Sequence, residues 1–93
     1  MRKIVLANEN EYEINRCGAA DGYLWIGFPK GVIDFIQAAS VLGDAEATKT
    51  IVSTYDFPGM ETVYEDYTEL VNIQKEYEGG LLVTLRKITL TEI

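Results

Sequence analysis

Two stretches rich in β-branched and aromatic residues constrain the fold of this chain most strongly. A short connection that ends in a pair of glycines joins them. They cover residues 63–74 and 81–88, and the short connection between them ends in Gly79-Gly80. Glycine takes the positive φ angles that a two-residue hairpin turn requires, because it has no Cβ atom. We therefore predict a β-hairpin over residues 62–88 with a tight turn at the two glycines.

The second arm of this hairpin is predicted to have one apolar and one polar face. Side chains alternate between the two faces along a strand, so the residues expected to point into the core are Leu81, Val83 and Leu85. The apolar pattern continues one residue out of phase at Ile88 and Leu90. An extra residue at Arg86-Lys87 would produce that shift, and we predict a β-bulge there.

The N-terminal third is also predicted to be β-structure. Residues 3–8 and 11–16 are expected to form a first hairpin, linked by asparagines that tolerate left-handed backbone angles. The Asp21-Gly22 pair predicts a turn. The apolar run over residues 23–28 predicts a further strand, which Pro29 ends.

A single helix is predicted over residues 32–42. Its apolar residues recur at helical spacing, so one face of the helix should contact the sheet. The side chains expected on or beside that face are Val32, Ile33, Ile36, Phe35 and Ala39. Gly43 is suited to cap the C-terminal end, and Trp25 is the expected packing partner of the helix.

The remaining segments complete an α+β fold. Asp44 is predicted to cap one further helical turn, residues 48–55 to form a strand, and Pro58-Gly59 to form a turn. We expect a small, mainly antiparallel β-sheet of about six or seven strands with one α-helix packed on it. The sequence contains no linker or repeat, so a single domain over residues 1–93 is predicted.

The charge balance of the chain limits its partners. Fifteen acidic residues against eight basic ones give a net charge of −7. The resulting field repels the phosphates of nucleic acid and of anionic membranes and attracts basic surfaces. We therefore expect a protein partner and no direct contact with nucleic acid or membrane. The acidity has two readings, plain solubility and mimicry of a nucleic acid.

The single cysteine, Cys17, excludes an internal disulfide, and no apolar run reaches the length of a membrane span. The short apolar run near the N-terminus ends in charge, which is typical of a strand and not of a signal peptide. A cytoplasmic protein is the expectation from these features.

The residues needed for common catalytic sites are missing from the sequence. The chain has no histidine, which excludes Ser/His and Cys/His nucleophile pairs and histidine metal sites. Arg16 beside Cys17 would lower the pKa of a thiol, but a small apolar side chain at a strand end is the preferred interpretation. The glycines around residues 27–31 lack the spacing of a phosphate loop. We predict a non-enzymatic protein with no catalytic residue, cofactor or metal.

The densest group of acidic and aromatic residues is the candidate protein-binding site. It comprises Glu61, Tyr64, Glu65, Asp66, Tyr67 and Glu69. Exposed tyrosines between carboxylates provide a large contact area at low entropic cost. Two alternatives remain open at this point. The acids are also explained by a solvated strand face, and the tyrosines by packing in the core or at its rim.

Four segments resemble a family of small proteins encoded by phages and prophages of Firmicutes. Residues 3–8 are similar to the opening "KIVLANG" of those proteins, and residues 44–51 to their "DPEATKTI". Residues 64–70 look like their "YEGYTEL", and residues 82–87 like their "VTLRK". The chain departs from this pattern where Ala45 replaces proline and Asp66 replaces glycine.

The resemblance implies a place among tail and virion genes and a role in protein interaction, without chemistry of its own. The expected partner is a phage structural subunit, or else a second copy of the chain, and the expected location includes the virion. The alternative function is an acidic anti-defence inhibitor that presents a nucleic-acid-like surface to a host defence protein, for example a CRISPR nuclease. The net charge of −7 motivates that alternative.

Overall fold

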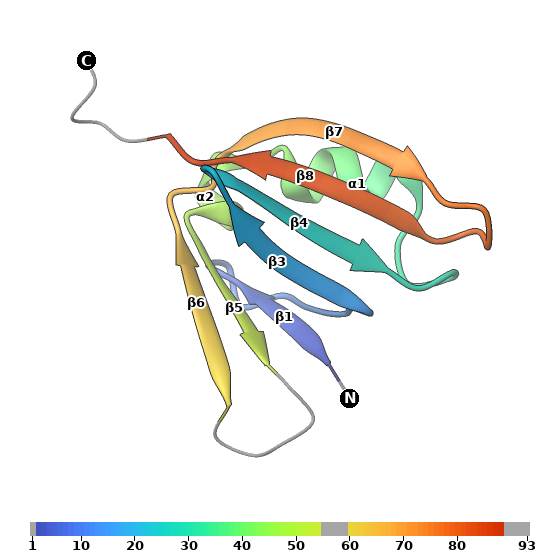
Figure 1. Ribbon diagram of the computed structural model, residues 1–93, viewed down its shortest axis with the longest axis horizontal. Helices are drawn as coiled ribbons and strands as arrows, with labels where there is room; N and C mark the ends of the chain where they lie inside the picture. The colour runs from blue at the N-terminus through green and yellow to red at the C-terminus, as the bar shows by residue number, and fades with distance from the viewer. Residues whose placement is uncertain (1, 55–59, 89–93) are drawn as a thin grey trace.

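The part of the chain that the structure describes forms two four-stranded antiparallel sheets and two short helices (Figure 1). In the computed structural model, residues 2–54 and 60–88 are described. The first sheet has the strand order β2 (Glu11–Glu13), β1 (Lys3–Leu6), β5 (Thr50–Thr54), β6 (Glu61–Glu65). The second has the order β3 (Arg16–Ala20), β4 (Tyr23–Phe28), β8 (Leu81–Arg86), β7 (Glu69–Lys75). The helices are α1 (Phe35–Leu42) and α2 (Ala45–Thr48).

The α+β class and the antiparallel pairing are as predicted, but the expectation of one sheet with one helix was wrong. The strands of the two sheets run in different directions in Figure 1. They share one hydrophobic core, to which both helices contribute. Its buried side chains are Ile4, Leu6 and Ile51 from the first sheet, Leu24, Ile26, Phe28, Leu81, Val83 and Leu85 from the second, Ala38, Leu42 and Ala47 from the helices, and Ile14 and Ile33 from connecting segments.

A bend after β2 carries the chain from the first sheet to the second. Only Ile14 and Asn15 separate β2, which pairs with β1, from β3, which pairs with β4. The Ile14 amide donates to the Arg2 carbonyl at 3.0 Å, and the Asn15 amide donates to the Gly27 carbonyl at 2.8 Å. Two successive amides thus bond to different sheets. The segment predicted as one strand over residues 11–16 is therefore divided between the two sheets.

A second crossing interrupts the predicted hairpin over residues 62–88. β6 pairs with β5 in the first sheet, whereas β7 pairs with β8 in the second. Asp66 lies between them with a φ of 68°. Its amide donates to the Lys49 carbonyl at 3.0 Å, and its carbonyl accepts from the Ile88 amide at 2.9 Å. Only β7 and β8 form the hairpin, because Asp66 turns the chain away from the first sheet.

The turn of that hairpin is longer than the two-glycine turn predicted for it. The Gly79 amide donates to the Glu76 carbonyl at 2.9 Å, and the Glu76 amide donates to the Gly80 carbonyl at 2.9 Å. Gly79 has a φ of 96°, as the third residue of a three-residue hairpin loop does. Gly80 has no positive φ and is needed for space, since a Cβ atom there would lie 2.4 Å from the Phe28 carbonyl oxygen.

The bulge lies on the opposite strand from the one predicted. β8 ends at Arg86, and its inward residues Leu81, Val83 and Leu85 are buried as expected. The register shift falls in β7, between Leu70 and Asn72. The extra residue is therefore accommodated by the edge strand of the second sheet, where a distorted ladder affects one neighbour only.

Helix α1 begins three residues later than predicted. Asp34 caps it, accepting from the Gln37 amide at 2.7 Å, and the Gln37 side chain accepts from the Asp34 amide at 3.2 Å. This reciprocal pair is a capping box, which fixes the first helical residue at Phe35. Gly43 forms the C-cap as predicted.

The side of α1 that faces the core also differs from the prediction. The buried residues of α1 are Ala38 and Leu42, whereas Ile36 is 80% exposed and Phe35 is 46% exposed. The helix packs against β7 and lies behind β7 and β8 in Figure 1. The predictions that Ile36 is buried and that Trp25 packs under the helix were therefore wrong. Ile33 is buried, but from the loop before the helix.

Other local predictions are confirmed. The first hairpin forms between β1 and β2, and Asp21 and Gly22 form a turn with positive φ angles of 54° and 82°. Asp44 caps α2 through the Glu46 amide at 3.0 Å. The strand predicted over residues 48–55 forms as β5 (Thr50–Thr54), although Thr48 belongs to α2. Strand β3 was not predicted, because Gly18, Ala19 and Ala20 have low β propensity. The predicted Pro58-Gly59 turn lies outside the described residues.

Two alanine substitutions in α1 test this orientation of the helix. Leu42→Ala should lower the free energy of unfolding by about 2–5 kcal/mol, because a fully buried side chain is removed and a cavity remains. Ile36→Ala should change it by no more than about 0.5 kcal/mol, because that side chain is exposed. Urea denaturation of both variants provides the measurement. Equal losses for the two, or a larger loss for Ile36→Ala, would contradict the orientation.

Candidate protein-binding site

The outer face of the second sheet carries two exposed aromatic side chains side by side. Leu24 and Ile26 of β4 point into the core, so Tyr23 and Trp25 point outward. Tyr23 is 41% exposed and Trp25 is 40% exposed. The cross-strand register defines the residues of this surface, which we call the aromatic face: Arg16, Gly18, Ala20, Tyr23, Trp25, Gly27, Leu82, Thr84, Arg86, Glu69, Asn72 and Gln74.

Small residues beside Trp25 leave its indole ring accessible. Trp25 lies opposite Gly18 on one side and Thr84 on the other. A Cβ atom built on Gly18 would have no heavy atom within 4 Å. Ala20 lies beside Tyr23 in the same way. Along β3, the neighbours of the two aromatic side chains are thus small residues, which leave space that a partner can fill.

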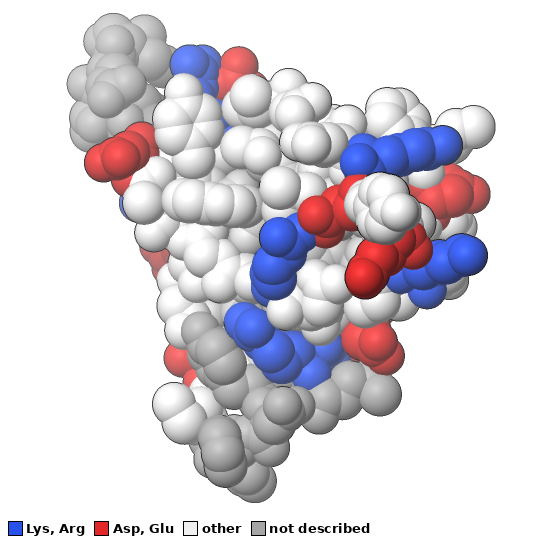
Figure 2. Space-filling model, turned by 45° about the vertical axis from the view of Figure 1, so that its right-hand side comes forward, with Lys and Arg blue, Asp and Glu red and all other residues white. Residues whose placement is uncertain are grey.

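The charges at the ends of the aromatic face are balanced within the chain. Arg86 forms an ion pair with Glu69 at one end, and Arg16 forms an ion pair with Glu76 at the other. Figure 2 shows a broad uncharged surface across the middle of the molecule, with basic and acidic side chains gathered together to its right. Because each arginine has a carboxylate beside it, the face carries little net charge and does not attract phosphate.

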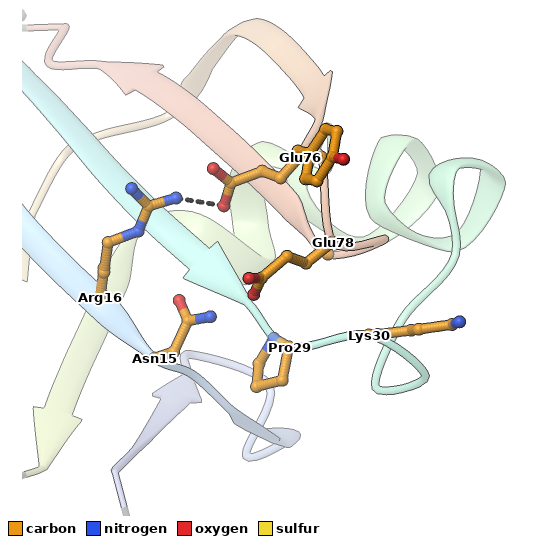
Figure 3. A pocket seen from close by; sticks show the side chains of 8 residues that line it. Asn15, Arg16, Pro29, Lys30, Glu76 and Glu78 are labelled. Atoms are coloured by element: carbon orange, nitrogen blue, oxygen red, sulfur yellow. Dashed lines mark hydrogen bonds and ion pairs between the residues drawn. The ribbon is translucent and has the colours of Figure 1, made fainter.

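A groove at one end of the aromatic face contains the second of these ion pairs. It has a volume of about 590 Å³ and includes Asn15, Arg16, Pro29, Lys30, Glu76 and Glu78 in its lining. In Figure 3 the Arg16 guanidinium points to Glu76, the Glu78 carboxylate faces the same space, and Lys30 points away. Two carboxylates therefore surround the one cation directed into the groove. We conclude that the groove is unsuited to an anionic ligand and extends the polar rim of the aromatic face.

The structure places the two candidate tyrosines in a packed pair. The rings of Tyr64 and Tyr67 meet edge to face, with centroids 6.1 Å apart and planes at 77°. Both are half-buried against the hydrophobic core, and the Lys87 ammonium lies 5.7 Å from the centre of the Tyr67 ring. Packing at the rim of the core thus accounts for much of their surface. Trp25 offers an open aromatic surface that the sequence interpretation had assigned to the core.

The four candidate acids are divided between the two sheets. Glu61 and Glu65 lie on β6, Asp66 lies at the crossing, and Glu69 lies on β7 beside Arg86. Glu61 and Glu65 each lie two residues from Val63 along β6, so all three point to the same, outer face of the first sheet. The acids therefore form no single continuous track on the protein.

Cys17 is half-buried near β5 and β6, in surroundings that do not activate it. Burial raises the pKa of the Cys17 thiol above its ordinary value of 9.0, while the hydroxyls of Ser53 and Tyr64 and the charge of Arg2 act in the opposite direction. The thiolate is the reactive form of cysteine. A raised pKa keeps the thiol protonated at neutral pH, which does not suit a nucleophile.

Thiol labelling tests this description of Cys17. At pH 8 a chromogenic disulfide reagent should react at least tenfold more slowly with the folded chain than with the urea-unfolded chain, because burial limits both access and ionisation. Folding favours the protonated thiol, so this contribution to stability is present below about pH 9 and lost as the pH rises through the folded-state pKa. Equal labelling rates would contradict a shielded thiol.

Within residues 2–54 and 60–88, no group of three metal-binding side chains is placed to hold an ion. No helix in the same residues is long and apolar enough to cross a membrane. Comparison of the chain with family models, curated proteins and solved structures gives no match. The surface chemistry of the chain and the resemblance of its four segments are therefore the bases for a functional proposal.

Proposed function

We propose that the chain is a non-enzymatic protein-binding module that holds its partner on the aromatic face, within a phage tail or virion assembly. The observation that carries the proposal is the exposure of Trp25 at the middle of an open sheet surface, with Tyr23 beside it towards one end. Tryptophan, tyrosine and arginine are the residues most enriched among those that dominate binding energy. All three types occur on this face, and the resemblance to phage proteins supports the setting.

The gain from covering Trp25 is large enough to matter. With the residue 40% exposed, roughly 80 Å² of a side chain of about 200 Å² remains in contact with water. At about 25 cal/mol per Å², covering that area contributes about 2 kcal/mol, or more than tenfold in affinity. The adjacent Gly18 allows a partner to approach the ring closely.

The size of the face indicates a weak individual contact. Four strands spaced by about 4.8 Å, each presenting residues over some 20 Å, give roughly 400 Å². A standard interface uses about 800 Å² on each partner. One copy of the chain would therefore bind weakly, and many copies in a regular assembly would bind firmly through avidity. A weak single contact is better suited to a repetitive structure such as a virion than to a soluble one-to-one complex.

The acidic anti-defence inhibitor remains the second proposal, since the net charge of −7 supports it. Imitation of a nucleic acid requires carboxylates in a continuous row that can meet several basic groups at once. Glu11, Glu69 and Glu76 are each engaged by a basic side chain of the chain itself. That internal pairing reduces the charge available to a nuclease groove and makes us prefer the aromatic face.

Gly18→Thr tests the proposal without removing any core contact. The added side chain enters open space in a strand, so the denaturation midpoint should stay within experimental error, while the bulk beside Trp25 should weaken partner binding at least tenfold. Trp25→Ala should weaken binding by a similar factor. Ile36→Ala, which removes exposed apolar surface from α1, is the matched control and should change affinity less than twofold.

The measurement is capture of the partner from a lysate of the source bacterium, followed by titration with the purified partner. Affinity should change less than threefold between 50 and 500 mM salt, because aromatic burial is weakly screened. Unchanged binding by both aromatic-face variants would refute the proposal. A tenfold or larger loss of affinity between 50 and 500 mM salt, together with inhibition of a nuclease, would favour the acidic inhibitor.

A further inference from the structure

A row of three valines crosses the outer face of the first sheet. The register pairs Val5 of β1 with Val52 of β5, and Val52 with Val63 of β6, so the three side chains lie on one face. Val63 is 54% exposed, and Val5 and Val52 are half-buried. Outward positions on strands are usually polar. We call this feature the valine row.

Carboxylates border the valine row. Glu11 of β2 lies opposite Val5 and ends the row, and Glu61 and Glu65 lie on either side of Val63 along β6. With Glu13 and Lys3 included, the strand residues of this face supply four carboxylates and one ammonium group, a net charge of −3. Lys3 itself is paired with Glu11. An apolar centre is thus rimmed by excess negative charge.

We propose that this face is a docking surface for a basic amphipathic helix of a partner protein. A second copy of the chain would bring two faces of charge −3 together, which costs free energy through like-charge repulsion. An uncharged apolar partner would desolvate Glu61 and Glu65 without compensating them. A partner with apolar residues along one side and lysine or arginine beside them satisfies both parts of the surface.

The spacing of the row fits a helix. Three valines on strands about 4.8 Å apart span about 10 Å. In a helix, side chains at positions i, i+4 and i+7 lie on one face and span about 10.5 Å at 1.5 Å per residue. Glu61 and Glu65 lie about 7 Å to either side of Val63, at the two flanks of a helix of about 10 Å diameter. Basic residues flanking the apolar stripe would meet them there.

The inference goes beyond the proposed function, because the aromatic face belongs to the other sheet. The two faces would respond differently to salt. Binding at the aromatic face depends on aromatic burial, whereas binding at the valine row depends in part on exposed charges that salt screens. A chain with both faces can link two different partners.

The test uses the full chain and a synthetic 15-residue peptide of leucine and lysine, with leucines at i, i+4 and i+7 on one helical side. A peptide of the same composition with its leucines dispersed around the helix is the peptide control. The protein variants are Val63→Thr and the double variant Glu61→Gln/Glu65→Gln. The double variant Glu46→Gln/Glu78→Gln removes the same charge from exposed positions elsewhere and is the protein control. Titration is followed by amide shifts in isotope-labelled protein.

We expect shifts centred on β1, β5 and β6. Val63→Thr should weaken binding at least threefold, Glu61→Gln/Glu65→Gln at least tenfold at low salt, and the protein control less than twofold. The dispersed peptide should bind at least tenfold more weakly. Equal binding of both peptides, equal effects of both charge removals, or shifts confined to the second sheet would each overturn the proposal. Gly18→Thr should leave peptide binding unchanged, so a failure of this inference is distinguishable from a failure of the proposed function.

Discussion

Burial of Ile14 at the junction between β2 and β3 fixes the point at which the chain leaves the first sheet and enters the second. The Ile14 side chain is 3% exposed, and its amide and that of Asn15 bond to different sheets. The chain can therefore leave the first sheet without leaving an amide unsatisfied, which would be costly in the interior. The segment with α1 and α2 brings the chain back to the first sheet, and the crossing at Asp66 then takes it to the second sheet again. Together they produce two sheets with one shared core and two separate outer faces.

Local patterns predicted much of the fold, because strand alternation and turn chemistry act over a few residues. Such local patterns account for the buried side chains of β8, the Asp21-Gly22 turn and the aspartate cap of each helix. The division into two sheets could not be predicted in this way, because it depends on which distant strand each amide meets. At Asp66 a signal was present. The phage motif that the segment resembles has glycine there, and a φ of 68° is a conformation that glycine adopts without strain.

The candidate site was missed for a related reason. The run over residues 23–28 is apolar at nearly every position, so alternation alone does not say which set faces the core. Position-by-position pairing with β8 settles it, since Leu24 and Ile26 lie opposite the buried Leu85 and Val83. The start of α1 was more accessible to sequence reasoning. Asp34 and Gln37 have the spacing of a capping box, which places the first helical residue at Phe35.

Physically, the two outer faces differ in how they combine apolar and charged groups. The aromatic face has its charges paired at the ends, whereas the valine row has excess carboxylate along its sides. A small domain of this size gains little stability from leaving either apolar set in water. Covering either set with a partner would remove that apolar area from water, which is the basis of both proposals.

Acrylamide quenching of tryptophan fluorescence shows directly whether Trp25 stands on an open face. Trp25 is the only tryptophan in the chain, so all of the emission reports on this position. With 40% of the residue exposed, the quenching constant of the folded chain should be within about threefold of that of the urea-unfolded chain. Emission that acrylamide scarcely quenches until the chain unfolds would place the indole in the core and rule out Trp25 as a contact residue of the aromatic face.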